Sequence, residues 1–203
     1  MRILLRRFVV IAGLILAGCF PAAFAQQPSA APQKTSDSKI TPKLTLGDSD
    51  GNPGGNIVVP IYFSPVDGME VGQLKFDIKF VSKNLKYSKV SRGIAAESGN
   101  VEIHPELKEE KNDKGLELST LTIVASIATP KPGQKGIPGG LLGYITFKVN
   151  ESAGPANITL HATAEAAELG TKKPIPNLQT VDAQVDVLAN GSEPLVSCFF
   201  FSH

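Results

Sequence analysis

Two runs of strictly alternating apolar residues limit the folds open to this chain more than any other feature. The first run is Ile57–Phe63 and the second is Leu74–Phe80, and a turn-rich segment separates them. The polar residues of the second run are Lys75, Asp77 and Lys79. Because successive side chains of a strand point to opposite faces, this run has one apolar and one charged face. It is typical of a sheet strand with one side on a core and the other side open to a partner.

The rest of the chain continues this pattern of short strands separated by turn residues. The Pro/Gly-rich segment 129–140 is a loop that no helix could cross, and the charged segment 105–114 is also predicted as a loop. The segment 162–169 tolerates a helix, but it is too short to alternate repeatedly with strands. Further strands are predicted at 43–47, 85–90, 100–103, 116–128, 141–149, 158–164 and 180–188. About nine short strands indicate an all-β sandwich or jelly roll rather than an α/β fold.

The first 25 residues are predicted to be an export signal. Three arginines precede a short apolar run at 8–20, Pro21 breaks that run, and small residues precede a cleavage point after Ala25. The apolar run is short for a membrane span. An alternative remains open within the same segment, because Leu16–Cys19 looks like a bacterial lipobox in which Cys19 would be lipidated. Export is expected in both cases, and attachment to a membrane only through such a lipid.

Two flanking segments are predicted to lie outside the folded domain. Residues 26–41 are rich in Gln, Ser, Pro and Ala and indicate a disordered linker. Residues 189–203 form a tail whose apolar cluster either packs on the domain or is a ragged end without function, and we favour the second. The folded domain is therefore expected to span 42–188.

Charge and composition exclude nucleic acid as a partner. The whole chain carries 20 Lys and Arg against 19 Asp and Glu, and loss of the leader's three arginines leaves 17 against 19, a net charge of −2. A mildly acidic chain with mixed signs lacks the basic patch that phosphate binding requires. Its aromatic residues also lack the clustering of an RNA-binding sheet.

No catalytic constellation is visible in the sequence, and the protein is not expected to be an enzyme. His104, His161 and His203 are scattered, and His161 falls on the polar phase of its strand, where a solvated surface histidine is expected. Glu109 and Glu110 lie in a charge run that is typical of a solvated loop.

Neither the cysteines nor the acidic residues of the sequence predict a strong metal or cofactor site. If cleavage follows Ala25, Cys198 is the lone cysteine of the mature chain, so neither an intramolecular disulfide nor a zinc site is expected. Asp48, Asp50 and Asn52 provide oxygen atoms at the spacing of a calcium loop. However, Pro53 and Val59 stand where such a loop needs Gly and a bidentate Glu. We expect a polar turn there, with a weak calcium site as the alternative.

The order of these segments resembles the cohesin domain family. The carriers of the resemblance span Lys43 to Leu188. They are a first strand that ends in Gly47, a Gly-rich turn before Ile57–Ile61, the run Phe76–Phe80, the segment Val90–Gly93, and the late strand Gly139–Val149. The combination in this order carries the resemblance, because each piece alone occurs in many sandwiches.

The resemblance implies a fold, a function and a site. The fold is a nine-stranded jelly-roll sandwich, shared with cellulose-binding modules, and the function is non-catalytic docking of a dockerin or another envelope protein, as in polysaccharide-degrading assemblies. The family docks its partner on the face that includes the third strand, here Val71–Phe80. The implied partner-binding residues are Gln73, Lys75, Asp77 and Lys79. Gln73 and Lys75 stand where family members often carry Asn and Asp, so the ligand is expected to differ from a standard dockerin.

Carbohydrate binding is the alternative function on the same fold. Sugar-binding modules usually present a row of Trp and Tyr, and this chain has no Trp. Four of its phenylalanines fall on the inward phase and are expected in the core: Phe63, Phe76, Phe80 and Phe147. The three tyrosines, Tyr62, Tyr87 and Tyr144, lie on different strands and would form only a thin platform.

Overall fold

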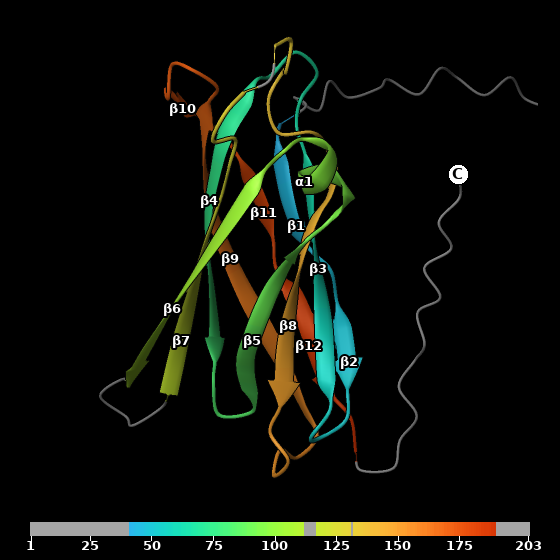
Figure 1. Ribbon diagram of the computed structural model, residues 1–203. Coiled ribbons are helices and arrows are strands. Elements are labelled where there is room, and N and C mark those ends of the chain that lie inside the picture. The colour runs from blue at the N-terminus through green and yellow to red at the C-terminus, as the bar shows by residue number, and fades with distance from the viewer. Residues whose placement is uncertain (1–40, 112–116, 131, 190–203) are drawn as a thin grey trace, which may run out of the picture. The chain divides into compact units, whose positions relative to one another are not determined.

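The computed structural model describes residues 41–111, 117–130 and 132–189, and this part of the chain is a two-layer β-sandwich (Figure 1). It contains twelve strands and one short helix, α1 (Ile94–Ser98). Nine strands have four or more residues: β1 (Lys43–Leu46), β3 (Asn56–Ser64), β4 (Val71–Val81), β5 (Leu85–Arg92), β6 (Glu102–Lys111), β7 (Glu117–Ser126), β8 (Gly140–Val149), β9 (Ala156–Glu168) and β12 (Ala183–Val187). Three strands are shorter: β2 (Ser49–Gly51), β10 (Pro174–Ile175) and β11 (Gln179–Val181).

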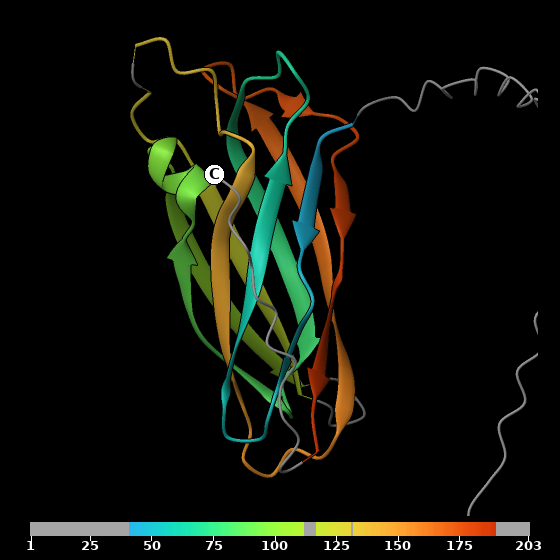
Figure 2. The ribbon, with the colours of Figure 1, turned by 90° about the vertical axis from the view of Figure 1, so that its right-hand side faces the viewer.

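The strands form two sheets that pack face to face (Figure 2). One sheet has the order β11-β1-β3-β8-β5, and the other has the order β2-β12-β9-β4-β7-β6, with β10 added beside β9. The pairs β1–β11 and β2–β12 are parallel, and the other pairs are antiparallel. The all-β sandwich predicted from the alternating runs is confirmed. The last predicted strand, 180–188, is divided into β11 and β12, which belong to different sheets.

The core lies between the two sheets and is built from the inward phases of the strands. Phe63, Phe76, Phe80 and Phe147 are all buried, as predicted. Phe80 comes from one sheet and Phe147 from the other, and their rings meet edge to face at a centroid distance of 5.1 Å. This geometry suits the quadrupole of aromatic rings and fixes the two sheets against each other.

Strand β6 corrects the loop predicted at 105–114. The strand runs through Pro105 and its charged neighbours to Lys111 and pairs with β7 along its whole length. Charged side chains and a proline are tolerated here because β6 is the last strand of its sheet, where one backbone edge and most side chains are open to water. The edge position therefore explains the composition that made this segment look like a loop.

Two more segments differ from their predictions. The helix-tolerant segment 162–169 continues β9 as far as Glu168, because alanines pair there with β4 through Leu74–Ala166 and Phe76–Ala164. Tertiary pairing overrides the weak strand propensity of alanine. The predicted polar turn at 48–52 contains β2, which pairs with β12. Helix α1 was not predicted, and it contributes buried Ala95 and Ala96.

The Pro/Gly-rich connection between β7 and β8 contains no helix in its described residues, as predicted. Gly136 has a φ of +104°, and a Cβ atom there would lie 2.6 Å from the backbone nitrogen of Val71. A glycine is therefore required by both conformation and space. The next residue, Ile137, donates a backbone hydrogen bond of 2.7 Å to Val71, which ties this loop to the start of β4.

Candidate functional site

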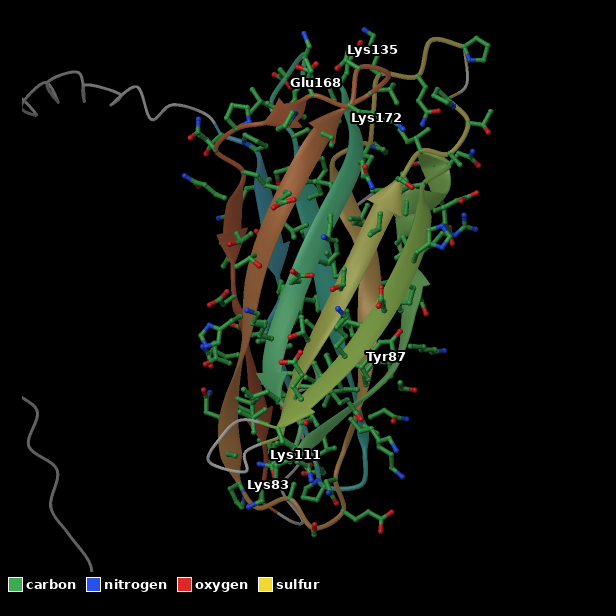
Figure 3. All side chains as sticks on the ribbon, turned by 90° about the vertical axis from the view of Figure 1, so that its left-hand side faces the viewer. Lys83, Tyr87, Lys111, Lys135, Glu168 and Lys172 are labelled. Atoms are coloured by element: carbon green, nitrogen blue, oxygen red, sulfur yellow. The ribbon has the colours of Figure 1, made fainter. Side chains whose placement is uncertain are left out.

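The four partner-binding residues predicted on β4 form one outward row. Gln73, Lys75 and Lys79 are exposed and Asp77 is half-buried, while the residues between them are buried in the core. The Thr122 hydroxyl on β7 donates a 2.6 Å hydrogen bond to Asp77 Oδ1. This bond holds the one half-buried carboxylate of the row in a defined position. Figure 3 views the sheet from this side, with β9, β4, β7 and β6 crossing the front.

The strands on either side of β4 extend the row into a surface. On β7 the outward residues beside Lys79, Asp77 and Lys75 are uncharged: Thr120, Thr122 and Val124. On β9 the residues beside the same three positions are His161, Thr163 and Glu165, and all three are exposed. Lys75 thus lies between an apolar valine and a carboxylate, and cross-strand pairs of opposite charge are favourable.

Strand β6 adds an acidic border. Its outward residues beside β7 are Glu102, His104, Glu106, Lys108 and Glu110, and all are exposed. His104 Nε2 lies 3.3 Å from Glu102 Oε2. The outward row of β6 was not predicted, because the composition of residues 105–114 indicated a loop. The signal was present in the half-buried Ile103 and Leu107, which are four residues apart and share one phase of the strand.

We call the outward residues of β9, β4, β7 and β6 the docking face. Charges of both signs are distributed over it in stripes. Its carboxylates are Glu102, Glu106, Glu110, Asp77 and Glu165, and its ammonium groups are Lys75, Lys79 and Lys108. An uncharged, β-branched row on β7 separates the acidic β6 row from the more basic β4 row. A partner would therefore need a complementary striped pattern rather than a single sign of charge.

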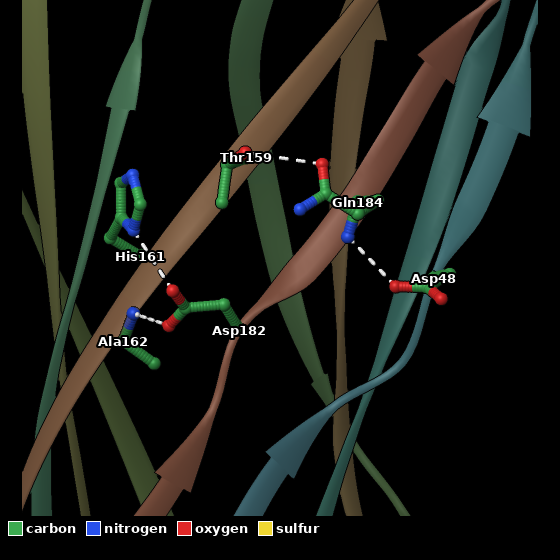
Figure 4. A network of polar contacts seen from close by, with 6 residues as sticks. All are labelled: Asp48, Thr159, His161, Ala162, Asp182 and Gln184. Carbon is green, nitrogen blue, oxygen red and sulfur yellow. Dashed lines mark hydrogen bonds and ion pairs between the residues drawn. The ribbon is translucent and has the colours of Figure 1, made fainter.

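A network of hydrogen bonds fixes the edge of the docking face beside β12 (Figure 4). Asp182 accepts the backbone N–H of Ala162 at 2.8 Å with one oxygen, and its other oxygen lies 2.9 Å from His161 Nδ1. The Thr159 hydroxyl donates to Gln184 Oε1 at 3.1 Å. His161 therefore has a structural partner and an exposed side chain, in agreement with its prediction as a surface histidine.

The predicted calcium ligands lie on and beside β2. Asp48 Oδ1 accepts the backbone N–H of Gln184 at 2.7 Å, so one oxygen of this carboxylate already has a role in holding β12. Within the part of the chain that the structure describes, no group of three His, Cys, Asp or Glu side chains could hold a metal ion. The weak calcium site stays an untested prediction.

The tyrosines proposed as a thin sugar platform do not share one face. Tyr62 on β3 and Tyr144 on β8 are half-buried on the outward phase of the other sheet. Tyr87 is placed on the inward phase instead, because it pairs with Phe147 across β5 and β8 and meets its ring at 6.5 Å. Tyr87 therefore cannot form a platform together with Tyr62 and Tyr144. Tyr87 lies two residues after buried Leu85, so alternation along β5 already places it on the inward phase, and the bulge between Tyr87 and Lys89 shifts the register only after it.

Several predicted features lie outside the described residues. These are the leader with Cys19, the linker up to residue 40, and the tail from residue 190 with Cys198 and His203. Across the described ranges, no helix has the length and apolar character needed to cross a membrane.

The two packed sheets define the protein as a two-layer β-sandwich with a charged outer face on one sheet. Comparison with known families makes the assignment specific, because the cohesin domain model matches residues 42–187. The chain belongs to the cohesin domain family, a family of non-catalytic protein-binding modules. The expectation that the protein is not an enzyme agrees with this membership.

Solved structures of cohesins share the fold. The third cohesin of ScaC from Acetivibrio cellulolyticus, solved with the ScaB dockerin, is 19% identical with a TM-score of 0.57, covering 73% of this chain and 100% of that one. The OlpA cohesin of Clostridium thermocellum, solved with Doc918, is 16% identical with a TM-score of 0.56 and the same coverage. A non-cellulosomal cohesin from Archaeoglobus fulgidus is 14% identical with a TM-score of 0.51, covering 75% of this chain and 94% of that one. A comparison with curated proteins found no match.

Proposed function

We propose that this protein is an exported module that binds a dockerin-like protein through the docking face. The observation that carries the proposal is the outward row of β4. Gln73, Lys75, Asp77 and Lys79 lie in line on a family-typical fold, and none of their side chains takes part in the core. The solved cohesin–dockerin complexes of Acetivibrio and Clostridium support a partner of this kind.

The pattern of charges defines what the partner should present. Lys75 and Lys79 stand beside the uncharged row of β7, so acidic or hydroxyl groups of a partner would meet them there. The acidic β6 border would in turn favour basic groups. Such complementarity sets specificity and the rate of encounter more than it sets affinity. Members of the cohesin family often carry Asn and Asp where this chain has Gln73 and Lys75. We therefore propose that the partner is a dockerin-like protein that differs from a standard dockerin.

Export is the second part of the proposal, and the leader sequence supports it. A basic start, an apolar run and a cleavage point after Ala25 are the elements of a signal peptide. Mass spectrometry of the mature N-terminus is the test. A chain that starts at Gln26 supports cleavage, a lipidated Cys19 supports a membrane anchor, and an intact leader contradicts export.

The docking proposal is tested by charge reversal on a purified pair. The partner is first captured from the culture fluid and envelope of the source organism, identified by mass spectrometry and expressed. Calorimetry then compares the original protein with the double variant Lys75→Glu, Lys79→Glu. We expect at least about a tenfold loss of affinity, which corresponds to about 1.4 kcal/mol.

The matched control reverses two exposed lysines on the other sheet, Lys43→Glu on β1 and Lys89→Glu on β5. It changes the net charge by the same amount, so it separates a local contact from a general effect of charge. The docking face is the wrong surface if the Lys75/Lys79 variant binds as well as the original protein, or if the control loses as much affinity.

A further inference from the structure

The lower end of the sandwich opens into a cleft between the two sheets. The cleft has a volume of about 500 Å³, and it is lined by β5 and β8 from one sheet and by β6 and β7 from the other. Figure 3 shows Tyr87 and Lys111, two of its lining residues, near this end. The volume falls within the range of about 300–1,000 Å³ typical of small-molecule sites.

The inward phases of β6 and β7 change from apolar to polar where they reach this cleft. On β7, buried Leu121 and Ile123 are followed by Ser119 on the same phase. On β6, half-buried Leu107 is followed by Glu109, which pairs in register with Ser119. A phase that packs on a core is normally apolar along its whole length. The change to polar residues here therefore needs a reason other than packing.

Ser119 is the central group of the cleft. It is 1% exposed and is the sole buried polar side chain among the residues that the structure describes. Within those same ranges its hydroxyl takes part in none of the hydrogen bonds, although it lines the cleft. The Ser119 side chain is almost wholly buried but its oxygen is not among the sealed, unsatisfied atoms of the described residues, so the hydroxyl is open to the cleft and available to a molecule that occupies it. The Ser119 hydroxyl can donate one hydrogen bond and accept others, so a ligand hydroxyl, which also donates and accepts hydrogen bonds, would suit it.

The charged rim carries both signs and so favours neither a simple cation nor a simple anion. Lys111 is paired with Glu117 at 3.1 Å, and Lys148 is paired with Glu151 at 3.7 Å. Beyond these two pairs, the lining carries two further carboxylates and one further ammonium group: Glu109, Glu110 and Lys86. A cation would meet three ammonium groups and an anion four carboxylates. A neutral molecule with several hydroxyls can satisfy donors and acceptors together.

Tyr87 provides an apolar wall in this polar surrounding. Its ring packs edge to face on Phe147 at 6.5 Å, which anchors it from the side of the core. Burial raises the pKa of the Tyr87 hydroxyl above its ordinary value, and a backbone hydrogen bond at Val90 offsets part of this effect. The phenol is therefore neutral at physiological pH, and its ring offers a flat surface to an apolar face of a ligand.

We propose that this cleft binds a neutral sugar of mono- or disaccharide size. Hydroxyls of the sugar donate to the Glu109 carboxylate and exchange hydrogen bonds with the Ser119 hydroxyl, while one face of the ring lies against Tyr87. The two groups assigned to the sugar, Glu109 and Ser119, lie on the opposite phase of their strands from Lys108 and Thr120 of the docking face, and Glu110 at the rim is the one lining residue that the cleft shares with that face. Binding of sugar therefore does not depend on binding of a partner protein.

The test is an NMR titration of the ¹⁵N-labelled protein with cellobiose, maltose and lactose at millimolar concentrations. We expect at least one of them to shift the amide signals of Tyr87, Glu109 and Ser119 while those of Gln73 to Lys79 stay in place. Ser119→Ala should weaken binding by about fivefold, since it removes one hydrogen-bond partner. Thr120→Ala, the next residue on the other phase, is the matched control and should bind as the original protein does.

Three results would overturn this proposal. The first is that none of the three sugars shifts the amide signals of the cleft. The second is that arginine amide or inorganic phosphate shifts these signals and the sugars do not, which would define an ion site. The third is that Ser119→Ala and Thr120→Ala bind sugar equally, which would place the sugar elsewhere. The Lys75/Lys79 variant should keep its sugar affinity, so failure of the docking proposal and failure of this one can be told apart.

Discussion

The two sheets share one core, yet their outer faces differ in chemistry. The docking face carries eight charged side chains in stripes across β6, β4 and β9. The opposite face is uncharged at its centre, where Val58, Pro60 and Tyr62 on β3 adjoin Tyr144 and Thr146 on β8. Inward positions are apolar at the centres of both sheets, so the difference between the two outer faces resides in the outward phase. Core packing therefore constrains the inward phase of each strand, whereas the residues of the outward phase are free to vary with function.

The largest expected effect comes from the core that both faces share. Phe147→Ala removes a fully buried ring that contacts Phe80 and Tyr87, and it should lower the free energy of unfolding by about 3–5 kcal/mol. Urea denaturation followed by circular dichroism measures this change. Tyr144→Ala, on the outward phase of the same strand, is the control and should cost less than half as much. Equal costs would mean that the opposite face is part of the core rather than a surface.

A smaller effect is expected at the edge of the docking face. Asp182→Ala leaves the backbone N–H of buried Ala162 without its acceptor and His161 without its partner, which should cost about 1–3 kcal/mol. Asp186→Ala is the control, because Asp186 is exposed and, among the described residues, its side chain accepts a hydrogen bond from the Asn157 side chain alone. Thermal unfolding of both variants measures the difference. If Asp186→Ala proved the more destabilising, the network in Figure 4 would not be what fixes this edge.

The smallest effect on stability is expected at the centres of the two faces. Val58 is 47% exposed on the opposite face, and Val58→Lys should change the free energy of unfolding by no more than about 0.5 kcal/mol. Val124→Lys introduces the same charge on the docking face, between His104 and Lys75. Calorimetry with the identified partner should show weaker binding for Val124→Lys and unchanged binding for Val58→Lys. The reverse order would move the docking site to the opposite sheet.

The sequence predicted most of the sandwich because the evidence for a strand is local. Alternation in Leu74–Phe80 revealed both the strand and its outward row, and the structure places Lys75, Asp77 and Lys79 on one face. The predictions of secondary structure were wrong where the position of a segment in the sheet mattered more than its amino-acid composition. The charged β6 could be a strand because it lies at a sheet edge, and the alanines of β9 could be strand residues because β4 pairs with them.

The docking face and the cleft differ in how far the sequence could reveal them. The β4 row follows from a period of two and was visible in the sequence, whereas its neighbours on β7, β9 and β6 depend on registers between segments far apart in the chain. The cleft depends on registers too, since Ser119 and Tyr87 come from different sheets. The bulge after Tyr87, which brings Val90 onto the inward phase, also became visible only in the pairing of β5 with β8.

By itself, the sequence determined the class of fold, the inward phenylalanines and the charged row of β4, because side-chain alternation is a property of one strand. Pairing between distant segments set which rows lie side by side, where β5 changes register after Tyr87, and that Glu109 and Ser119 share a cleft. The physical reason is that register and the packing of one sheet on another arise between distant segments, and no local period records them.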